Sequence, residues 1–158
     1  MKSMISFLIM SLFSLTATMA QSDKTSSIKD AIESKQYIFK ARTVLPSNGS
    51  TRQLTSEYDF TVNKDSILAY LPYFGRAYVA TIGNTDGGIN FTCTEFSYKV
   101  TEEKKGGWII RIKPKNAGDV QLINLNISKK GYGTLHVDCQ NRQGISYTGK
   151  VDPLKKNQ

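Results

Sequence analysis

The sequence predicts a mainly β protein, folded as an antiparallel sandwich or a curved, barrel-like sheet of about nine or ten strands with one short N-terminal helix. Two observations carry this prediction. After Gln36, apolar and polar residues alternate with a period of two in a succession of short segments, and no helical period occurs. Clusters of glycine, asparagine, proline and lysine separate these segments, as turns between antiparallel strands do.

Residues 1–20 are predicted to be a secretory signal peptide that is removed. Lys2 supplies a positive start, residues 4–15 an apolar run, and residues 18–20 the small side chains typical of a cleavage site before Gln21. The run is shorter than the roughly 20 apolar residues that a membrane-spanning helix needs, so we expect no membrane span. We therefore expect an exported protein, periplasmic or secreted, that is soluble once the signal peptide is removed.

The mature chain has the length of a single domain. We expect one β domain over residues 21–151 and a disordered tail over residues 152–158. The formal charge falls from +8 to +7 on processing, because Lys2 is the only charged residue removed. Much of the positive charge lies in turns and in the tail, where lysine serves solubility and protects sheet edges. We expect no nucleic-acid partner for an exported protein, whereas attraction to anionic envelope polymers or lipid head groups stays open.

A short helix is predicted where Ser26 and Ser27 precede Ile28, Ala31 and Ile32. Serine is favoured at helix starts, and the spacing puts the three apolar side chains on one helical face. Strands joined by turns follow to the end of the domain, with a glycine-rich loop over residues 83–88. The predicted strands span residues 37–42, 57–62, 66–71, 77–82, 89–94, 95–101, 108–113, 119–128, 134–139 and 145–151.

Residues 70–78 hold four aromatic side chains within nine positions, around a proline, a glycine and an arginine. Because proline cannot continue a central strand and glycine permits a sharp turn, we expect a corner here. The corner could be a hydrophobic plug for one end of the core or a binding lip. Since adjacent residues of an extended chain point to opposite sides, we expect Phe74 to point inward and Tyr73 and Arg76 to point outward. The candidate binding residues are Tyr70, Tyr73, Arg76 and Tyr78.

The two cysteines share the inward-facing parity of their predicted strands. Cys93 shares one strand face with Ile89 and Phe91, and Cys139 shares one face with Leu135 and Val137. In an oxidising compartment they could form a disulfide, and otherwise they would be two buried free thiols. The sequence leaves both alternatives open, because it does not give the separation of the two side chains.

The sequence offers few residues for catalysis or metal binding. His136 is the only histidine, and Asp138 shares its outward face, so the two could form a charge pair or the base of a hydrolytic group. No serine lies in a nucleophile-elbow motif and no second histidine completes a zinc site, so we expect no catalytic residue, cofactor or metal. The loop at residues 84–88 has oxygen-bearing side chains but lacks the downstream carboxylate of a calcium loop.

Four segments carry a family resemblance. They are residues 70–78, Gly-Gly-Ile-Asn-Phe at 87–91, the turn at 127–132, and Asn-Arg-Gln-Gly-Ile-Ser-Tyr-Thr-Gly at 141–149. Together they resemble the family called domain of unknown function 4251, small exported proteins of Bacteroides-type bacteria. The resemblance covers most of the mature chain and implies an exported bacterial protein. It implies no activity, cofactor or catalytic residue.

The function that these observations favour is non-catalytic binding. Tyrosine combines an apolar face with a hydroxyl group, and arginine stacks on aromatic rings or binds carboxylates, so the corner is suited to a small or extended ligand or an envelope partner. One alternative is an envelope hydrolase that uses Asp65, Asp86 or Asp138. The other is a purely structural accessory of the envelope. The sequence indicates neither the ligand nor the oligomeric state.

Overall fold

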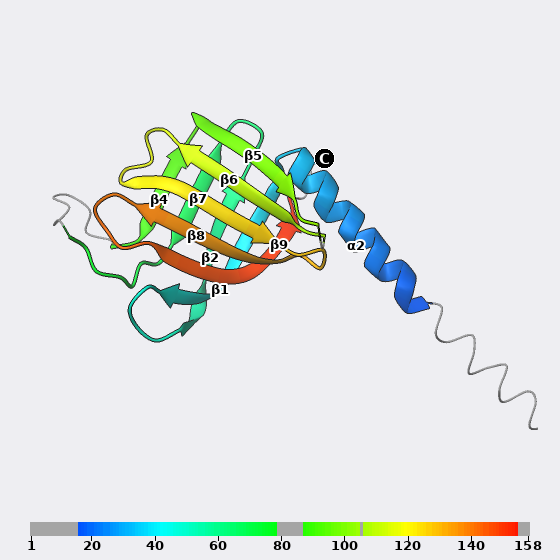
Figure 1. The fold of residues 1–158 in the computed structure, drawn as a ribbon, viewed down its shortest axis with the longest axis horizontal. Helices are drawn as coiled ribbons and strands as arrows, with labels where there is room; N and C mark the ends of the chain where they lie inside the picture. The colour runs from blue at the N-terminus through cyan, green and yellow to red at the C-terminus, as the bar shows by residue number, and fades with distance from the viewer. Residues whose placement is uncertain (1–15, 79–86, 105, 155–158) are drawn as a thin grey trace, which may run out of the picture.

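A computed structural model describes residues 16–78, 87–104 and 106–154, and in it the strands form one sheet that curls into a nearly closed barrel (Figure 1). Every pairing is antiparallel, and the strand order is β4-β3-β2-β1-β9-β8-β7-β6-β5. The predicted fold class is confirmed. The elements are α2 (Thr16–Glu33), β1 (Tyr37–Pro46), β2 (Arg52–Val62), β3 (Ile67–Leu71), β4 (Ile89–Cys93), β5 (Phe96–Glu102), β6 (Trp108–Pro114), β7 (Val120–Ile127), β8 (Tyr132–Cys139) and β9 (Ile145–Pro153).

Two meanders build the barrel. Strands β1 to β4 pair in sequence order, strands β5 to β9 do the same, and β9 joins the two meanders by pairing with β1. The alternation predicted from the sequence is realised as burial: in β3, Ile67, Ala69 and Leu71 are buried, whereas Leu68 and Tyr70 are exposed. Inward-facing side chains from all the strands fill the interior, with β5 contributing the partly buried Phe96 and Tyr98, so the barrel contains a packed core.

Phe39 of β1 occupies the centre of the core, opposite Phe60 of β2, and both rings are fully buried. Room for Phe39 comes from two glycines that face each other across β8 and β9. A Cβ atom on Gly133 would lie 3.2 Å from the Phe39 ring, and one on Gly149 would collide with the backbone carbonyl of Lys40. The register of β1 also shifts here, between Ala41 and Thr43, against both of its neighbours. Bulges and strand glycines bend a sheet, so this side of the barrel is strongly curved.

Helix α2 covers one end of the barrel with its last turns. Ile28, Ala31 and Ile32 are buried, as their spacing predicts, and the Tyr98 hydroxyl of β5 donates a hydrogen bond of 3.2 Å to the Ile32 carbonyl. The helix is longer than predicted, since it begins at Thr16 and spans the expected cleavage position. Its first turns extend away from the barrel (Figure 1). No helix in the described residues is long and apolar enough to cross a membrane.

Two boundaries differ from the predicted ones. β9 continues to Pro153, because Tyr37 pairs with it at the start of β1, so the predicted tail at 152–158 begins too early. The predicted strand at 77–82 and the glycine-rich loop at 83–88 lie largely outside the described residues, and so does the candidate calcium loop. Ala77 forms a single antiparallel bridge with Arg142 instead of part of a described strand.

Candidate functional site

The chain leaves β3 after Leu71, crosses the end of the barrel opposite α2 and runs beside the loop between β8 and β9. Backbone hydrogen bonds fix this path: the Tyr78 N–H donates to the Asn141 carbonyl at 2.8 Å, and the Gln143 N–H donates to the Arg76 carbonyl at 3.1 Å. The corner is therefore held by the barrel rather than projecting freely from it.

Within the corner, the expected directions of Tyr73 and Phe74 are wrong. Phe74 is 41% exposed, whereas Tyr73 is partly buried and packs against the core. The Tyr73 hydroxyl reaches the carbonyls of Arg76, at 3.0 Å, and Gln143, at 2.9 Å, and its ring folds over Gly75, where a side chain would collide with it. A phenylalanine could not satisfy these carbonyls, which explains why tyrosine takes the inner position. Arg76 is exposed, as expected.

The side chain of Arg142, in the loop between β8 and β9, holds the corner from the other side. Arg142 donates two hydrogen bonds to Asp119, from Nε at 2.8 Å and from Nη2 at 2.7 Å, and a third from Nη1 to the Gly88 carbonyl at 3.1 Å. Its guanidinium carbon lies 4.7 Å from the centre of the Tyr73 ring. The hydrogen bonds to Asp119 raise the pKa of Arg142 against the opposing effect of burial.

These contacts tie together four segments that are distant in sequence: the corner, the start of β4, the loop between β6 and β7, and the loop between β8 and β9. The Asp119 and Arg142 side chains are only 12% and 14% exposed. Tyr147, from the core, adds a further bond, since its hydroxyl donates to the Pro72 carbonyl at 2.7 Å. Sequence reasoning missed both members of the ion pair, because they lie 23 positions apart in separate loops.

Beside the corner the surface has a hollow of about 320 Å³, which we term the aromatic cleft. The rings of Tyr58 and Tyr70 stack on one another in it, with centroids 5.5 Å apart and an interplanar angle of 28°. Tyr70 is 55% exposed, and the Arg52 guanidinium lies 5.1 Å from the centre of the Phe74 ring. The residues that line the cleft are Tyr58, Tyr70, Leu71, Pro72, Tyr73, Phe74, Gly87, Gly88 and Asn90.

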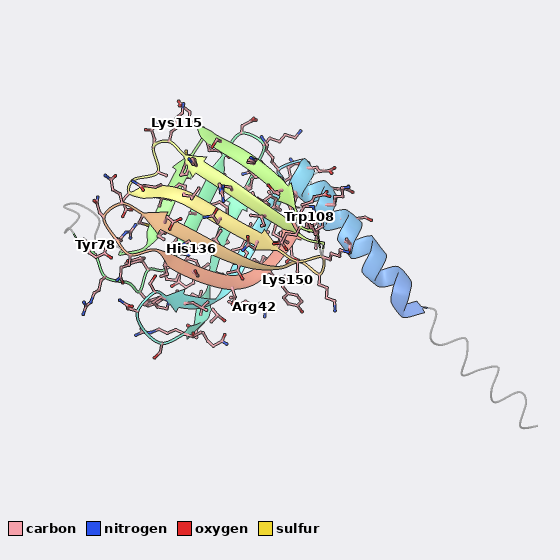
Figure 2. All side chains as sticks on the ribbon, in the orientation of Figure 1. Arg42, Tyr78, Trp108, Lys115, His136 and Lys150 are labelled. Atoms are coloured by element: carbon pink, nitrogen blue, oxygen red, sulfur yellow. The ribbon has the colours of Figure 1, made fainter. Side chains whose placement is uncertain are left out.

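The four predicted binding residues are only partly brought together. Tyr70 and Tyr73 line the aromatic cleft, whereas Arg76 and Tyr78 are exposed on the corner and do not line it. Tyr78 is 66% exposed (Figure 2). Tyr58 was missed as a binding residue, because the alternation of residues 57–62 indicated only that it belongs to the apolar face of a strand.

His136 forms a hydrogen-bonded chain on the outer face of the barrel. Its Nδ1 lies 2.8 Å from Ser146 Oγ and its Nε2 lies 3.0 Å from Asp138 Oδ1 (Figure 2). With the proton on Nε2 donated to Asp138, Nδ1 accepts the Ser146 hydroxyl proton, which is the order of groups in a nucleophilic triad. However, β8 and β9 are each paired on both sides, so the sheet already uses the backbone N–H groups that would form an oxyanion hole. The chain of three is best explained as a cross-strand polar network.

Of the carboxylates named for a hydrolase, the two that the structure describes do not converge. Asp65 lies in the turn between β2 and β3, and Asp138 lies on β8, with β1 and β9 between them in the sheet. Asp86 lies outside the described residues. Among the residues that are described, no group of three or more histidines, cysteines or carboxylates could hold a metal ion.

The disulfide left open by the sequence is not formed, because both cysteines are free. Cys93 pairs with Ile67 at the helix-covered end, and its thiol donates to the Glu95 carbonyl at 3.1 Å. Cys139 lies at the other end, where burial, together with the charge of Asp119, raises its pKa to about 11. Strand alternation correctly placed both thiols on the inner side of the sheet, but it did not show that they lie at opposite ends of the barrel.

Comparison with known proteins identifies the family of this chain but assigns no activity to it. No curated protein matches the chain. It is similar to a crystal structure of a DUF4251 family protein from Bacteroides eggerthii DSM 20697, with a TM-score of 0.61 and 18% sequence identity over 84% of this chain and 91% of that one. The family model described as domain of unknown function (DUF4251) matches residues 19–151. The chain therefore belongs to the DUF4251 family.

Proposed function

We propose that this domain is a non-catalytic binding module that holds a sugar ring of a glycan in the aromatic cleft. The observation that carries the proposal is the stacked pair of Tyr58 and Tyr70, with Tyr70 55% exposed beside the hollow. Exposed aromatic faces beside a hollow mark surfaces that bind ligands more often than surfaces that only face water.

The lining suits a ring that is apolar on its faces and polar at its edge. The faces of Tyr70 and Phe74 can pack against the C–H face of a sugar, while Asn90 offers an amide to its hydroxyl groups. Arg52, above Phe74, adds a donor at the rim. Such a mixture of apolar surface and a few fixed polar groups is typical of sites for small ligands.

The cleft is also built to keep its shape. Its wall at Gly88 is held by Arg142, and its wall at Tyr73 is held by two hydrogen bonds and by the same guanidinium. A site that is already ordered loses little conformational freedom on binding, which favours affinity for a small ligand. Export, predicted from residues 1–20, would bring the domain to the compartments where glycans are abundant.

Titration of ¹⁵N-labelled protein with cellohexaose, maltohexaose and mannohexaose tests the proposal. We expect at least one hexasaccharide to shift the amide resonances of Tyr70 and Asn90, and we expect Tyr70→Ala and Phe74→Ala each to weaken that binding about tenfold or more, equivalent to about 1.4 kcal/mol. The matched control is Leu68→Ala, since Leu68 is also exposed on β3 but lies outside the cleft. If no hexasaccharide shifts the cleft amides, or if the control weakens binding as much, the proposal is wrong.

A further inference from the structure

The outer face of the barrel has a second, larger hollow. It has a volume of about 720 Å³ and crosses β7, β8, β9, β1 and the start of β2. We term it the outer groove. None of its lining residues belongs to the aromatic cleft.

A row of uncharged polar side chains lies across the outer groove. The strand register pairs Asn126 with Thr134, Thr134 with Thr148, Thr148 with Thr43, and Thr43 with Gln53. All five line the groove. Because neighbouring strands are about 4.8 Å apart, the row extends over roughly 19 Å. A row of hydroxyl and amide groups of this length matches an extended ligand that carries a hydrogen-bonding group on each successive unit.

The hollow coincides with features of the fold that also shape the core. Gly133 and Gly149 lie beneath it, where their missing side chains admit Phe39 and let β9 approach the Lys40 carbonyl closely. The shift in the register of β1 falls beside Thr43, in the same place. Both features increase the local bend of the sheet, and together they set the polar row into a hollow rather than on a flat face.

An aromatic ring borders the row. Tyr132 lines the groove and is 66% exposed, although a large side chain at this strand position could have been replaced by a smaller polar one. Tyrosine offers a rigid, amphipathic contact surface at a low cost in conformational entropy. The charged residues that line the groove among the described residues are Arg42 and Glu103, neither of which forms a salt bridge with any described residue.

From this combination we infer that the outer groove is a second saccharide-binding site, which takes a neutral, extended oligosaccharide. The uncharged row binds hydroxyl groups along the chain, and Tyr132 stacks on one ring. A strongly acidic chain is disfavoured, because Glu103 is the only anion and Arg42 the only cation that line the groove among the described residues. The inference is independent of the aromatic cleft, since the two sites share no lining residue.

The register also relates the groove to the cleft. Tyr132 of β8 pairs with Lys150 of β9, Lys150 with Lys40 of β1, Lys40 with Asp59 of β2, and Asp59 with Tyr70 of β3. The two exposed tyrosines therefore belong to one row and lie four strands apart, roughly 19 Å along the sheet. A single polysaccharide chain could contact both sites, whereas a short oligosaccharide would occupy them separately.

The experiment uses the three neutral hexasaccharides, an acidic hexasaccharide of hyaluronan and a neutral glycine-serine hexapeptide as separate probes of the ¹⁵N-labelled protein. We expect a neutral hexasaccharide to shift the amide resonances of Gly133, Thr134 and Thr148. Combined Thr134→Val and Thr148→Val substitutions remove two hydroxyl groups and keep β-branched side chains that suit a strand. They should weaken binding at the groove at least tenfold, and Tyr132→Ala should do so separately.

The matched control is Thr92→Val, which removes a hydroxyl from an exposed position of β4 outside both sites and should leave binding unchanged. Phe74→Ala should weaken binding at the cleft about tenfold or more and leave the shifts at the groove unchanged, so failure of either site is distinguished from failure of the other. The inference is overturned if no neutral hexasaccharide shifts the groove amides, if the doubly substituted protein binds as well as the unmodified one, or if only the hyaluronan probe or the peptide shifts them.

Discussion

Replacing Arg142 with alanine should destabilise the domain more than any other substitution at its surface loops. Removal of the guanidinium leaves Asp119, only 12% exposed, without its two donors, and takes the donor from the Gly88 carbonyl. Breaking a buried ion pair on one side costs about 3–5 kcal/mol. Because both carboxylate oxygens and a backbone carbonyl are affected, we expect a loss of about 3 kcal/mol in the free energy of unfolding, a large fraction of the total for a domain of this size.

Urea unfolding followed by circular dichroism measures this loss, and two further variants identify its cause. Arg142→Lys keeps the charge but cannot form the paired hydrogen bonds to Asp119 or stack flat on Tyr73, so we expect an intermediate loss of about 1–2 kcal/mol. Asp119→Ala combined with Arg142→Ala removes both charges and should be less destabilising than the sum of the two single changes.

The reasoning would be refuted by a loss below about 1 kcal/mol in Arg142→Ala, since a carboxylate that is only 12% exposed should cost more than that when it loses its partner. Strict additivity in the double-mutant cycle would refute it as well, because it would mean that the two side chains do not interact.

Three other predictions concern the corner, Cys139 and processing. Phe74→Ala should change the free energy of unfolding by less than about 1 kcal/mol, whereas Tyr147→Phe should cost about 1–2 kcal/mol by leaving the Pro72 carbonyl unpaired, and thermal melts compare the two. Burial raises the pKa of Cys139 from 9.0 to about 11. The contribution of its neutral thiol to the free energy of unfolding is therefore complete below pH 9 and is lost as the pH rises toward 11. Over this range the urea midpoint of Cys139→Ala should fall less than that of the unmodified protein. Intact-mass measurement of the protein from its native envelope should give a chain that begins within a few residues of Gln21, and retention of residues 1–20 would contradict export as a soluble protein.

Period-two alternation was sufficient to predict the fold class, because most strands bury one face and expose the other. In β3 the inward parity of Ile67, Ala69 and Leu71 is realised at each position. The spacing of Ile28, Ala31 and Ile32 was sufficient for the buried face of α2 in the same way. These features depend only on the local spacing of apolar residues, so a single sequence is enough to predict them.

The candidate site depends on contacts that periodicity does not encode. The direction of Tyr73 is set by carbonyls of the corner and of the loop after β8, so the parity of an extended chain gave the wrong answer. Asp119 and Arg142 meet only once the barrel has brought their loops together. The polar row of the outer groove likewise needs the strand order, since Gln53 and Asn126 lie on strands far apart in sequence.

The incomplete closure of the barrel makes self-association a hazard for this chain. Among the described strands, β4 and β5 each pair on one side only, and a free edge of this kind can template pairing with another molecule. β5 carries exposed charges at Lys99 and Glu102, which oppose such pairing, and the end of α2 lies against it through the contact of Tyr98 with Ile32. The last turns of the helix therefore act as a guard against aggregation as well as a cover for the core, and a chain trimmed beyond Glu33 should form oligomers through its open edge.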